Sequence, residues 1–346
     1  MARFTKFVNG RIFRDNQFTT NEELWVDGQE GIILDSDSKL PSPESTRVVD
    51  LQGMILAPGF IDIQINGAFG FDFSGLDPDM PVPDFEQALH ETNRRLVSTG
   101  TTSYLPTMTS QPEKIYRKVV PLLRPTGAAR NPQLGSESLG AHLEGPFFSH
   151  QRTGCHSLDA ILPLDNQATP ELVKQVYGEH NLRNHVKMIT LAPERDGALD
   201  AIRELSDIGV ITSIGHTSAN YEQACAAVEA GSSVLTHLFN AMNGLHHREP
   251  GPFGLIAPPS NQAISGHFDL LDGGRPYFGV IADGVHLHGT SIRAAFNAHP
   301  QGLILVTDAV MFMGCPDGLH KWTNGQKVVK NGPIIKLEGT ETIAGR

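Results

Sequence analysis

The sequence predicts a (β/α)8 barrel, and three observations lead to this fold class. Short β-rich runs recur from Phe60 onward and alternate with helical stretches. Several helical stretches end in glycine and lead directly into the next run, as βα units do. The runs number eight, which closes a barrel of parallel strands: FIDIQING, TTSYLPTM, LGAHLEGPF, VKMITLAPE, GVITSIGHT, SSVLTHLFNAM, YFGVIADGVH and GLILVTDAV. A doubly wound open sheet is the competing fold, but the sequence contains neither a GxGxxG nor a Walker A pattern.

Residues 1–56 precede the barrel and are predicted to form a small β domain. They read as short strands with an Asn-Gly and an Asp-Gly turn: FTKFVNGRIF, ELWVDGQEGIIL and RVVDLQGMILAPG. The barrel is expected at residues 57–318. Residues 319–346 follow the eighth run as a β segment, and we expect them to contribute to the same small, sandwich-like β domain.

The composition limits the class of function. With 39% hydrophobic and 19% charged residues, the 346-residue chain is predicted to be globular, and no run approaches the roughly 18 apolar residues of a membrane helix. The net charge of −11 without a Lys/Arg cluster argues against nucleic acid as a partner. Three scattered cysteines without a CxxC pair fit a cytoplasmic protein. Because the net charge is negative, any anionic ligand must be held by a few local cationic side chains.

Polar residues collect at the ends of the predicted strands, where the active site of such a barrel lies. Taken singly, each has a structural explanation, such as a hydrogen-bonded histidine or a helix-capping aspartate. A glutamate, two histidines and an aspartate at one rim are not explained in this way. In strand order the residues are Gln64, Asn66, His142, Glu144, Glu194, His216, His237, Asn240, Asp283, His286 and Asp308.

Glu144, His216 and His237 form the candidate metal site. Two imidazoles and one carboxylate match the His₂Glu set of catalytic zinc sites, which leave one position open for water. Asp308 is the nearby carboxylate that would take a proton from this water and return it to a leaving group. The residues therefore predict metal-assisted hydrolysis of an unspecified substrate. Zinc is the expected ion, with cobalt, iron and manganese as alternatives.

Six motifs resemble those of the N-acetylglucosamine-6-phosphate deacetylases of the amidohydrolase superfamily: HLEGPF, GHTSA, THLFNAM, HREPG, IADGVH and VTDAV. The motifs occur in the family's order, and THLFNAM with HREPG is the most specific pair. The resemblance implies hydrolysis of N-acetyl-D-glucosamine 6-phosphate to D-glucosamine 6-phosphate and acetate. It also implies one divalent metal ion per subunit and a homodimer.

The resemblance assigns roles to individual positions. Glu144, His216 and His237 fall on the metal ligands, and Asp308 falls on the general base and acid. His156 falls on a histidine that polarises the acetyl carbonyl, and Cys155 lines the same loop. The positions implied to hold or contact the sugar phosphate are Asn240, Ala241, Arg248, His286, Thr342, Ile343 and Ala344. Arg248 is the residue expected to complete the phosphate site of a neighbouring subunit, with a surface salt bridge to Glu249 or Asp283 as its alternative.

Gln64 and Asn66 occupy the place where many amidohydrolases carry His-x-His and hold a second metal. Amides are poor zinc ligands compared with imidazoles, so we expect a single tightly held metal. The two amides should instead form hydrogen bonds within the site. Substrate contact, which we assign to Gln64, and a purely structural role at the rim are both open. Asp62 and Glu194 are expected to support the rim by hydrogen bonds.

Two alternatives to this function remain. One is a deacetylase of another acetamido sugar phosphate, such as the galactosamine analogue. The other is a truncated homologue that binds without turnover, because family members continue beyond the final GTETIAGR through a barrel helix and further strands. We therefore expect a C-terminally truncated product that is less stable than the complete enzyme.

Overall fold

The computed structural model describes residues 2–14, 16–20, 22–34, 45–75, 80–127, 131–163, 167–257 and 274–345. The chain divides into two compact units, Met1–Phe60 and Ile61–Arg346. The first is a small β unit and the second contains the barrel, so both predicted architectures are present.

The small unit contains two sheets of short strands. One has the order β5-β4-β1-β6, and the other has the order β3-β2-β7. The predicted Asn-Gly turn lies between β1 and β2, with Asn9 at a φ of 54°, but it joins strands of different sheets instead of forming a hairpin. The strands are β1 (Phe4–Val8), β2 (Arg11–Arg14), β3 (Gln17–Thr20), β4 (Leu24–Asp27), β5 (Ile32–Leu34), β6 (Thr46–Asp50) and β7 (Ile55–Leu56).

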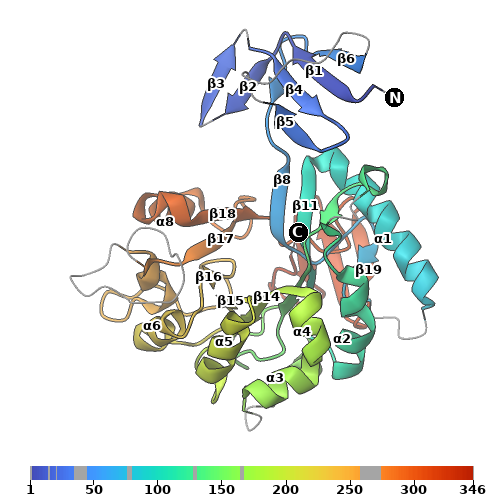
Figure 1. The fold of residues 1–346 in the computed structure, drawn as a ribbon. Helices are drawn as coiled ribbons and strands as arrows, with labels where there is room; N and C mark the ends of the chain where they lie inside the picture. The colour runs from blue at the N-terminus through green and yellow to red at the C-terminus, as the bar shows by residue number, and fades with distance from the viewer. Residues whose placement is uncertain are drawn as a thin grey trace. The chain divides into compact units, whose positions relative to one another are not determined.

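The eight predicted runs all form strands of one barrel sheet (Figure 1). Their order around the barrel follows the sequence, and each pair from β11 to β18 is parallel. β8 pairs with β11, and a parallel bridge between Ile65 and Ala309 connects β8 to the chain after β18. The strands are β8 (Phe60–Ile65), β11 (Thr101–Met108), β13 (Ala141–Glu144), β14 (Val186–Leu191), β15 (Ile211–Ile214), β16 (Val234–Leu235), β17 (Tyr277–Ile281) and β18 (Leu303–Val306).

Helices connect the strands and bury their apolar faces against the barrel. Asn220 and Gln223 form a reciprocal capping box at the start of α6, and Gly209 and Gly231 follow α5 and α6 at positive φ, as the glycine-terminated pattern predicts. No helix of the described residues has both the length and the apolar character needed to cross a membrane. The helices are α1 (Val82–Leu96), α2 (Glu113–Val119), α3 (Pro170–Tyr177), α4 (Glu179–Asn184), α5 (Ala198–Asp207), α6 (Tyr221–Glu229) and α8 (Gly289–Ala298).

A three-stranded antiparallel sheet follows the barrel and packs on its rim. It consists of β19 (Gly318–Lys321), β20 (Lys327–Asn331) and β21 (Ile334–Leu337). Trp322, Val328 and Ile335 form a buried cluster with Val310 and Phe312, which directly follow β18. This segment therefore groups with the barrel instead of with residues 1–60, because its apolar side chains are buried against the rim. The remaining short strands are β9 (Gly67–Ala68), β10 (Phe71–Asp72) and β12 (Glu137–Ser138).

Candidate active site

Three side chains with metal-ligating atoms converge at the carboxyl end of the barrel. Glu144 is the last residue of β13, and His216 and His237 lie two residues beyond β15 and β16. Their exposed fractions are only 2%, 4% and 3%. The two histidines have φ values of 49° and 29°, a conformation that is uncommon outside glycine. The backbone therefore turns sharply as it leaves each strand, and such strain is typical of functional sites.

The distances among the three residues suit a cation. Nε2 of His216 and Nε2 of His237 are 3.1 Å apart, and each lies 3.2 Å from Oε1 of Glu144. Nδ1 of His216 donates to the carbonyl oxygen of Arg152 at 2.8 Å, because a carbonyl can only accept. Nε2 of a neutral His216 therefore presents a lone pair to the centre. A metal-ligating histidine commonly donates its other N–H in this way, so the donor set fits a divalent ion.

The charge states of Glu144 and His216 suit a cation, whereas at His237 the contact with Glu144 outweighs burial and raises the pKa. Burial alone would raise the pKa of Glu144, but its contacts with His216 and His237 hold this pKa well below its usual range. Burial lowers the pKa of His216, so the neutral imidazole is the favoured form. An ionised carboxylate next to a neutral imidazole is the form in which both groups bind a metal.

Gln64 and Asn66 both donate to the same oxygen of Asp308, which lies two residues after β18. The distances from Asp308 Oδ1 are 2.8 Å to Nδ2 of Asn66 and 3.2 Å to Nε2 of Gln64. The Gln64 amide also donates to Oε1 of Glu144 at 2.9 Å. One amide nitrogen thus bridges two carboxylates. The prediction of hydrogen bonds within the site is confirmed.

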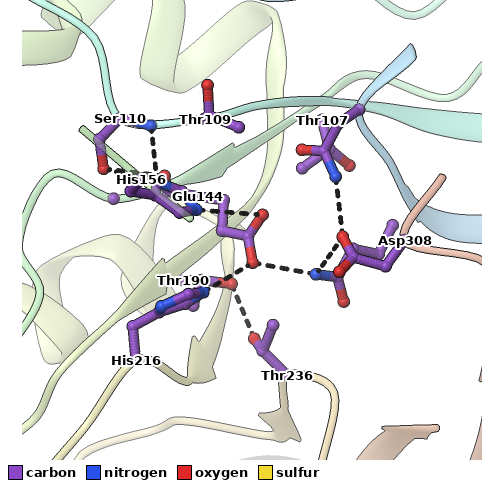
Figure 2. A network of polar contacts seen from close by, with 12 residues as sticks. Thr107, Thr109, Ser110, Glu144, His156, Thr190, His216, Thr236 and Asp308 are labelled. Carbon is purple, nitrogen blue, oxygen red and sulfur yellow. Dashed lines mark hydrogen bonds and ion pairs between the residues drawn. The ribbon is translucent and has the colours of Figure 1, made fainter. Parts of the chain in front are cut away.

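His156 lies on the side of Glu144 away from Asp308, as Figure 2 shows. Its Nδ1 accepts a hydrogen bond from the backbone N–H of Ser110 at 3.1 Å, so the ring proton of the neutral imidazole must be on Nε2. This Nε2 is 3.9 Å from Oε2 of Glu144. Burial, together with the charge of His216, lowers the pKa of His156 to about 3. His156 is therefore a neutral N–H donor beside the metal site.

A cavity of about 280 Å³ joins these groups. Its lining includes the three metal-ligating residues, Asp308 and Asn66, but Gln64 is not among the lining residues that the structure describes. Both amide contacts of Gln64 are to carboxylates, so its predicted substrate contact has no support in the lining. The other predicted residues that line the cavity are Cys155, His156, Asn240, Ala241, His286 and Ile343.

Besides Gln64, three predicted substrate residues lie outside the cavity lining. Arg248 is exposed and, within the described chain, forms no ion pair with Glu249 or Asp283. Ala344 is fully buried in the cluster beneath the post-barrel sheet. Thr342 is partly buried, and its carbonyl accepts from the backbone N–H of Leu337.

Several positioning residues were not found from the sequence. The hydroxyl groups of Tyr116 and Tyr177 both donate to the carbonyl oxygen of Gly145 at 2.8 Å and hold the turn after Glu144. Ser110 orients His156, and Trp322 lines the cavity. The sequence did contain one signal, because the polar residues TSQ directly follow the second barrel strand.

Glu194 and Asp62 support the rim as expected. Glu194 accepts hydrogen bonds from the hydroxyl of Thr217 and the backbone N–H of Ser218, which immediately follow His216. Asp62 accepts from the hydroxyl of Thr307 at 2.6 Å and so holds the residue before Asp308. Both carboxylates thus hold the backbone next to a predicted site residue, His216 or Asp308.

Known deacetylases are similar to this chain in sequence and in structure. No family model matches the chain. The N-acetylglucosamine-6-phosphate deacetylase of Homo sapiens is 39% identical over 350 residues, covering 99% of this chain and 78% of the relative. An N-acetylgalactosamine-6-phosphate deacetylase of Escherichia coli O157:H7 is 31% identical over 315 residues, covering 91% and 75%. The crystal structure of the N-acetylglucosamine-6-phosphate deacetylase of Pasteurella multocida superimposes with a TM-score of 0.77 at 29% identity, covering 99% and 80%.

Proposed function

Because the chain belongs to the family of N-acetylglucosamine-6-phosphate deacetylases, we propose that it hydrolyses N-acetyl-D-glucosamine 6-phosphate to D-glucosamine 6-phosphate and acetate. One observation carries this proposal for the present chain. Glu144, His216 and His237 bring a carboxylate oxygen and two imidazole nitrogens together in a cavity that Asp308 also lines. These are the groups required to activate water and to move its proton.

Glu144, His216 and His237 hold one divalent cation, for which zinc is the ion we propose. When bound, such an ion lowers the pKa of water and polarises a carbonyl group. The protein contributes the fixed geometry of the three ligands. The carbonyl of Arg152 keeps the His216 lone pair directed at the centre, and the two tyrosines on Gly145 hold the turn that follows Glu144.

Asp308 acts as the general base and then as the general acid. It accepts a proton from the attacking water and returns it to the nitrogen of the leaving amine, so that the C–N bond breaks. Its Oδ1 is held by the amides of Asn66 and Gln64, which leaves Oδ2 to exchange the proton. Two N–H donors on one oxygen also stabilise the ionised carboxylate.

His156 stabilises the negative charge that develops on the acetyl carbonyl oxygen. The hydrogen bond from Ser110 keeps the His156 proton on Nε2. This nitrogen lies on the edge of the ring that is nearer to Glu144. Because the ring stays neutral, this donor adds no charge that would repel the cation. An N–H donor directed at a developing oxyanion is a common source of rate enhancement.

The sugar phosphate lies towards the loops after β16 and β17. Asn240, Ala241 and His286 line this side of the cavity. Phe239 and Ala241 have positive φ values of 78° and 49°. Where residues of positive and negative φ follow one another, their backbone N–H groups can form a concavity that binds anions. We assign the segment of Thr342, Ile343 and Ala344 to contact with the sugar, and of these three residues Ile343 lines the cavity. We assign the exposed Arg248 to the phosphate site of a partner subunit in a cytoplasmic homodimer.

Acetate release from N-acetyl-D-glucosamine 6-phosphate tests the proposal. The purified chain is supplied with zinc, and Asp308→Asn serves as the inactive control because asparagine keeps the size and the hydrogen-bond acceptor. Asp27→Asn is the matched variant, since Asp27 is a buried carboxylate of the small β unit and does not line the cavity. We expect at least a hundredfold loss of kcat for Asp308→Asn only. No acetate from the metal-loaded wild-type chain would refute the proposal.

The galactosamine epimer is the alternative substrate, which the 31% identity to the Escherichia coli enzyme supports. The ratio of kcat/KM for the two epimers distinguishes the two candidate substrates, because both present the same acetamide to the metal site. A ratio in favour of N-acetyl-D-galactosamine 6-phosphate would replace the proposed substrate.

A further inference from the structure

The two ends of the active-site cavity are lined from opposite sides of the barrel. In the order β8, β11, β13, β14, β15, β16, β17, β18, strands β11 and β16 are four places apart, as are β13 and β17. Thr109 and His156 follow β11 and β13, whereas Asn240 and His286 follow β16 and β17. Eight strands close one barrel, so four places correspond to opposite sides.

This arrangement determines which way the acyl group of a bound substrate points. The inference rests on the proposed function, in which Asn240 and His286 hold the sugar. In a planar acetamide, the nitrogen and the methyl group leave the carbonyl carbon in different directions. With the nitrogen on the sugar side, the acetyl methyl group points towards Thr109, Cys155 and His156.

A second cavity, of about 360 Å³, lies behind these residues. The two cavities adjoin, because four residues line both of them and form the wall between them: Thr109, Cys155, His156 and Trp322. A methylene group takes roughly the volume of one water, about 30 Å³ in the liquid. The second cavity therefore has room for several methylene groups.

Three of the four wall residues are tied to other elements by hydrogen bonds. Oγ1 of Thr109 contacts Oγ of Ser74 at 3.1 Å, and Nε1 of Trp322 donates to Oδ2 of Asp72 at 3.0 Å. His156 is held by Ser110. Cys155 is thus the wall residue whose side chain can be shortened without breaking any of these bonds.

The surroundings of Cys155 suit contact with a methyl group. Its side chain packs against the apolar cluster that contains Trp322. Burial, together with the charge of Asp308, raises the pKa of the Cys155 thiol above its usual value, so the side chain is uncharged. An uncharged, partly buried cysteine of this kind behaves as a small hydrophobic residue.

We propose that Cys155 limits the acyl group to acetyl, and that the cavity behind it is a latent subsite for longer, uncharged acyl chains. Shortening Cys155 would connect the two cavities and admit N-propanoyl and N-butanoyl glucosamine 6-phosphates. The reaction itself does not change, since water adds to the carbonyl carbon and the C–N bond breaks to release the corresponding carboxylate.

The test compares release of D-glucosamine 6-phosphate from the N-acetyl, N-propanoyl and N-butanoyl substrates. The measured quantity is the butanoyl-to-acetyl ratio of kcat/KM on a single preparation, in which any partly misfolded fraction cancels. We expect Cys155→Ala to raise this ratio at least tenfold, since one methylene group in a pocket changes kcat/KM by about 10- to 200-fold. Ala160 lines only the second cavity, so adding Ala160→Phe to Cys155→Ala should return the ratio towards the wild-type value.

Each other outcome overturns part or all of the proposal. An unchanged ratio in Cys155→Ala, or equal turnover of acetyl and butanoyl substrates by the wild type, shows that Cys155 does not limit the acyl length. A raised ratio that Ala160→Phe leaves unchanged shows that the second cavity is not the subsite. No amine release from any substrate by the wild type would overturn the proposed function and this inference together, and is distinguishable from the first two outcomes.

Discussion

The backbone N–H of Ser110 donates a 3.1 Å hydrogen bond to Nδ1 of His156. A backbone N–H cannot accept, so this contact determines which nitrogen of His156 carries the proton. The Nε2–H donor on the opposite edge of the ring is therefore present without any dependence on the metal.

Replacing His156 by alanine should lower kcat by about 100- to 1,000-fold with a smaller effect on KM, because the donor acts on charge that develops in the transition state. Steady-state kinetics with N-acetyl-D-glucosamine 6-phosphate check this prediction. Ser110→Ala is the matched control: it removes the Ser110 hydroxyl, 3.0 Å from Nδ1, but retains the backbone N–H. A loss in Ser110→Ala as large as that in His156→Ala would contradict the assignment.

The pH profile of kcat/KM should show an acid limb from Asp308. Burial and the charge of Glu144 raise the pKa of Asp308 to about 7, and a general base must be ionised. Activity therefore falls as the pH drops through this pKa. A cation at Glu144 offsets its charge and moves the midpoint below 7 in the metal-loaded enzyme. An acid limb with a midpoint above pH 7 would argue against Asp308 as the base.

Metal content should be one ion per chain in the wild type and two in the Gln64→His/Asn66→His double variant. The Gln64 amide bridges Glu144 and Asp308, and imidazoles at the two positions would supply ligands in its place. Elemental analysis after dialysis against limiting zinc measures the stoichiometry. Gln64→Ala/Asn66→Ala is the control that removes the amides without adding ligands. Two ions bound to the wild type would contradict the role given to the amides.

Asp62 should make the folded chain less stable as the pH rises from about 4 to 6. Burial raises its pKa from 3.8 to about 6, so the folded state favours the protonated form. The contribution is favourable below pH 4 and is lost as the pH rises through 6. This difference in the pKa of Asp62 corresponds to a change of about 3 kcal/mol in the free energy of unfolding. Urea unfolding of Asp62→Asn should show this pH dependence reduced by that amount, and an unchanged dependence would refute the prediction.

The architecture followed from local patterns. Strand and helix periodicities located all eight barrel strands, because each β run or helix is indicated by the hydrophobic pattern of its own consecutive residues. The side chains at the strand ends were found because all strands of a parallel barrel present their carboxyl ends at one rim. Glu144, His216 and His237 were predicted together for this reason, and the structure brings their ligating atoms within 4.8 Å of one another.

The sequence by itself thus determined the barrel, the order of its strands and the chemical groups at its rim, because residue type and periodicity are local properties. Only the tertiary structure decided which atoms meet. Asn66 and Asp308 are 242 residues apart and come together when the barrel closes, and Trp322 reaches the cavity through the post-barrel sheet. Contacts of this kind depend on closure of the sheet and on side-chain packing in three dimensions, which no short stretch of sequence contains.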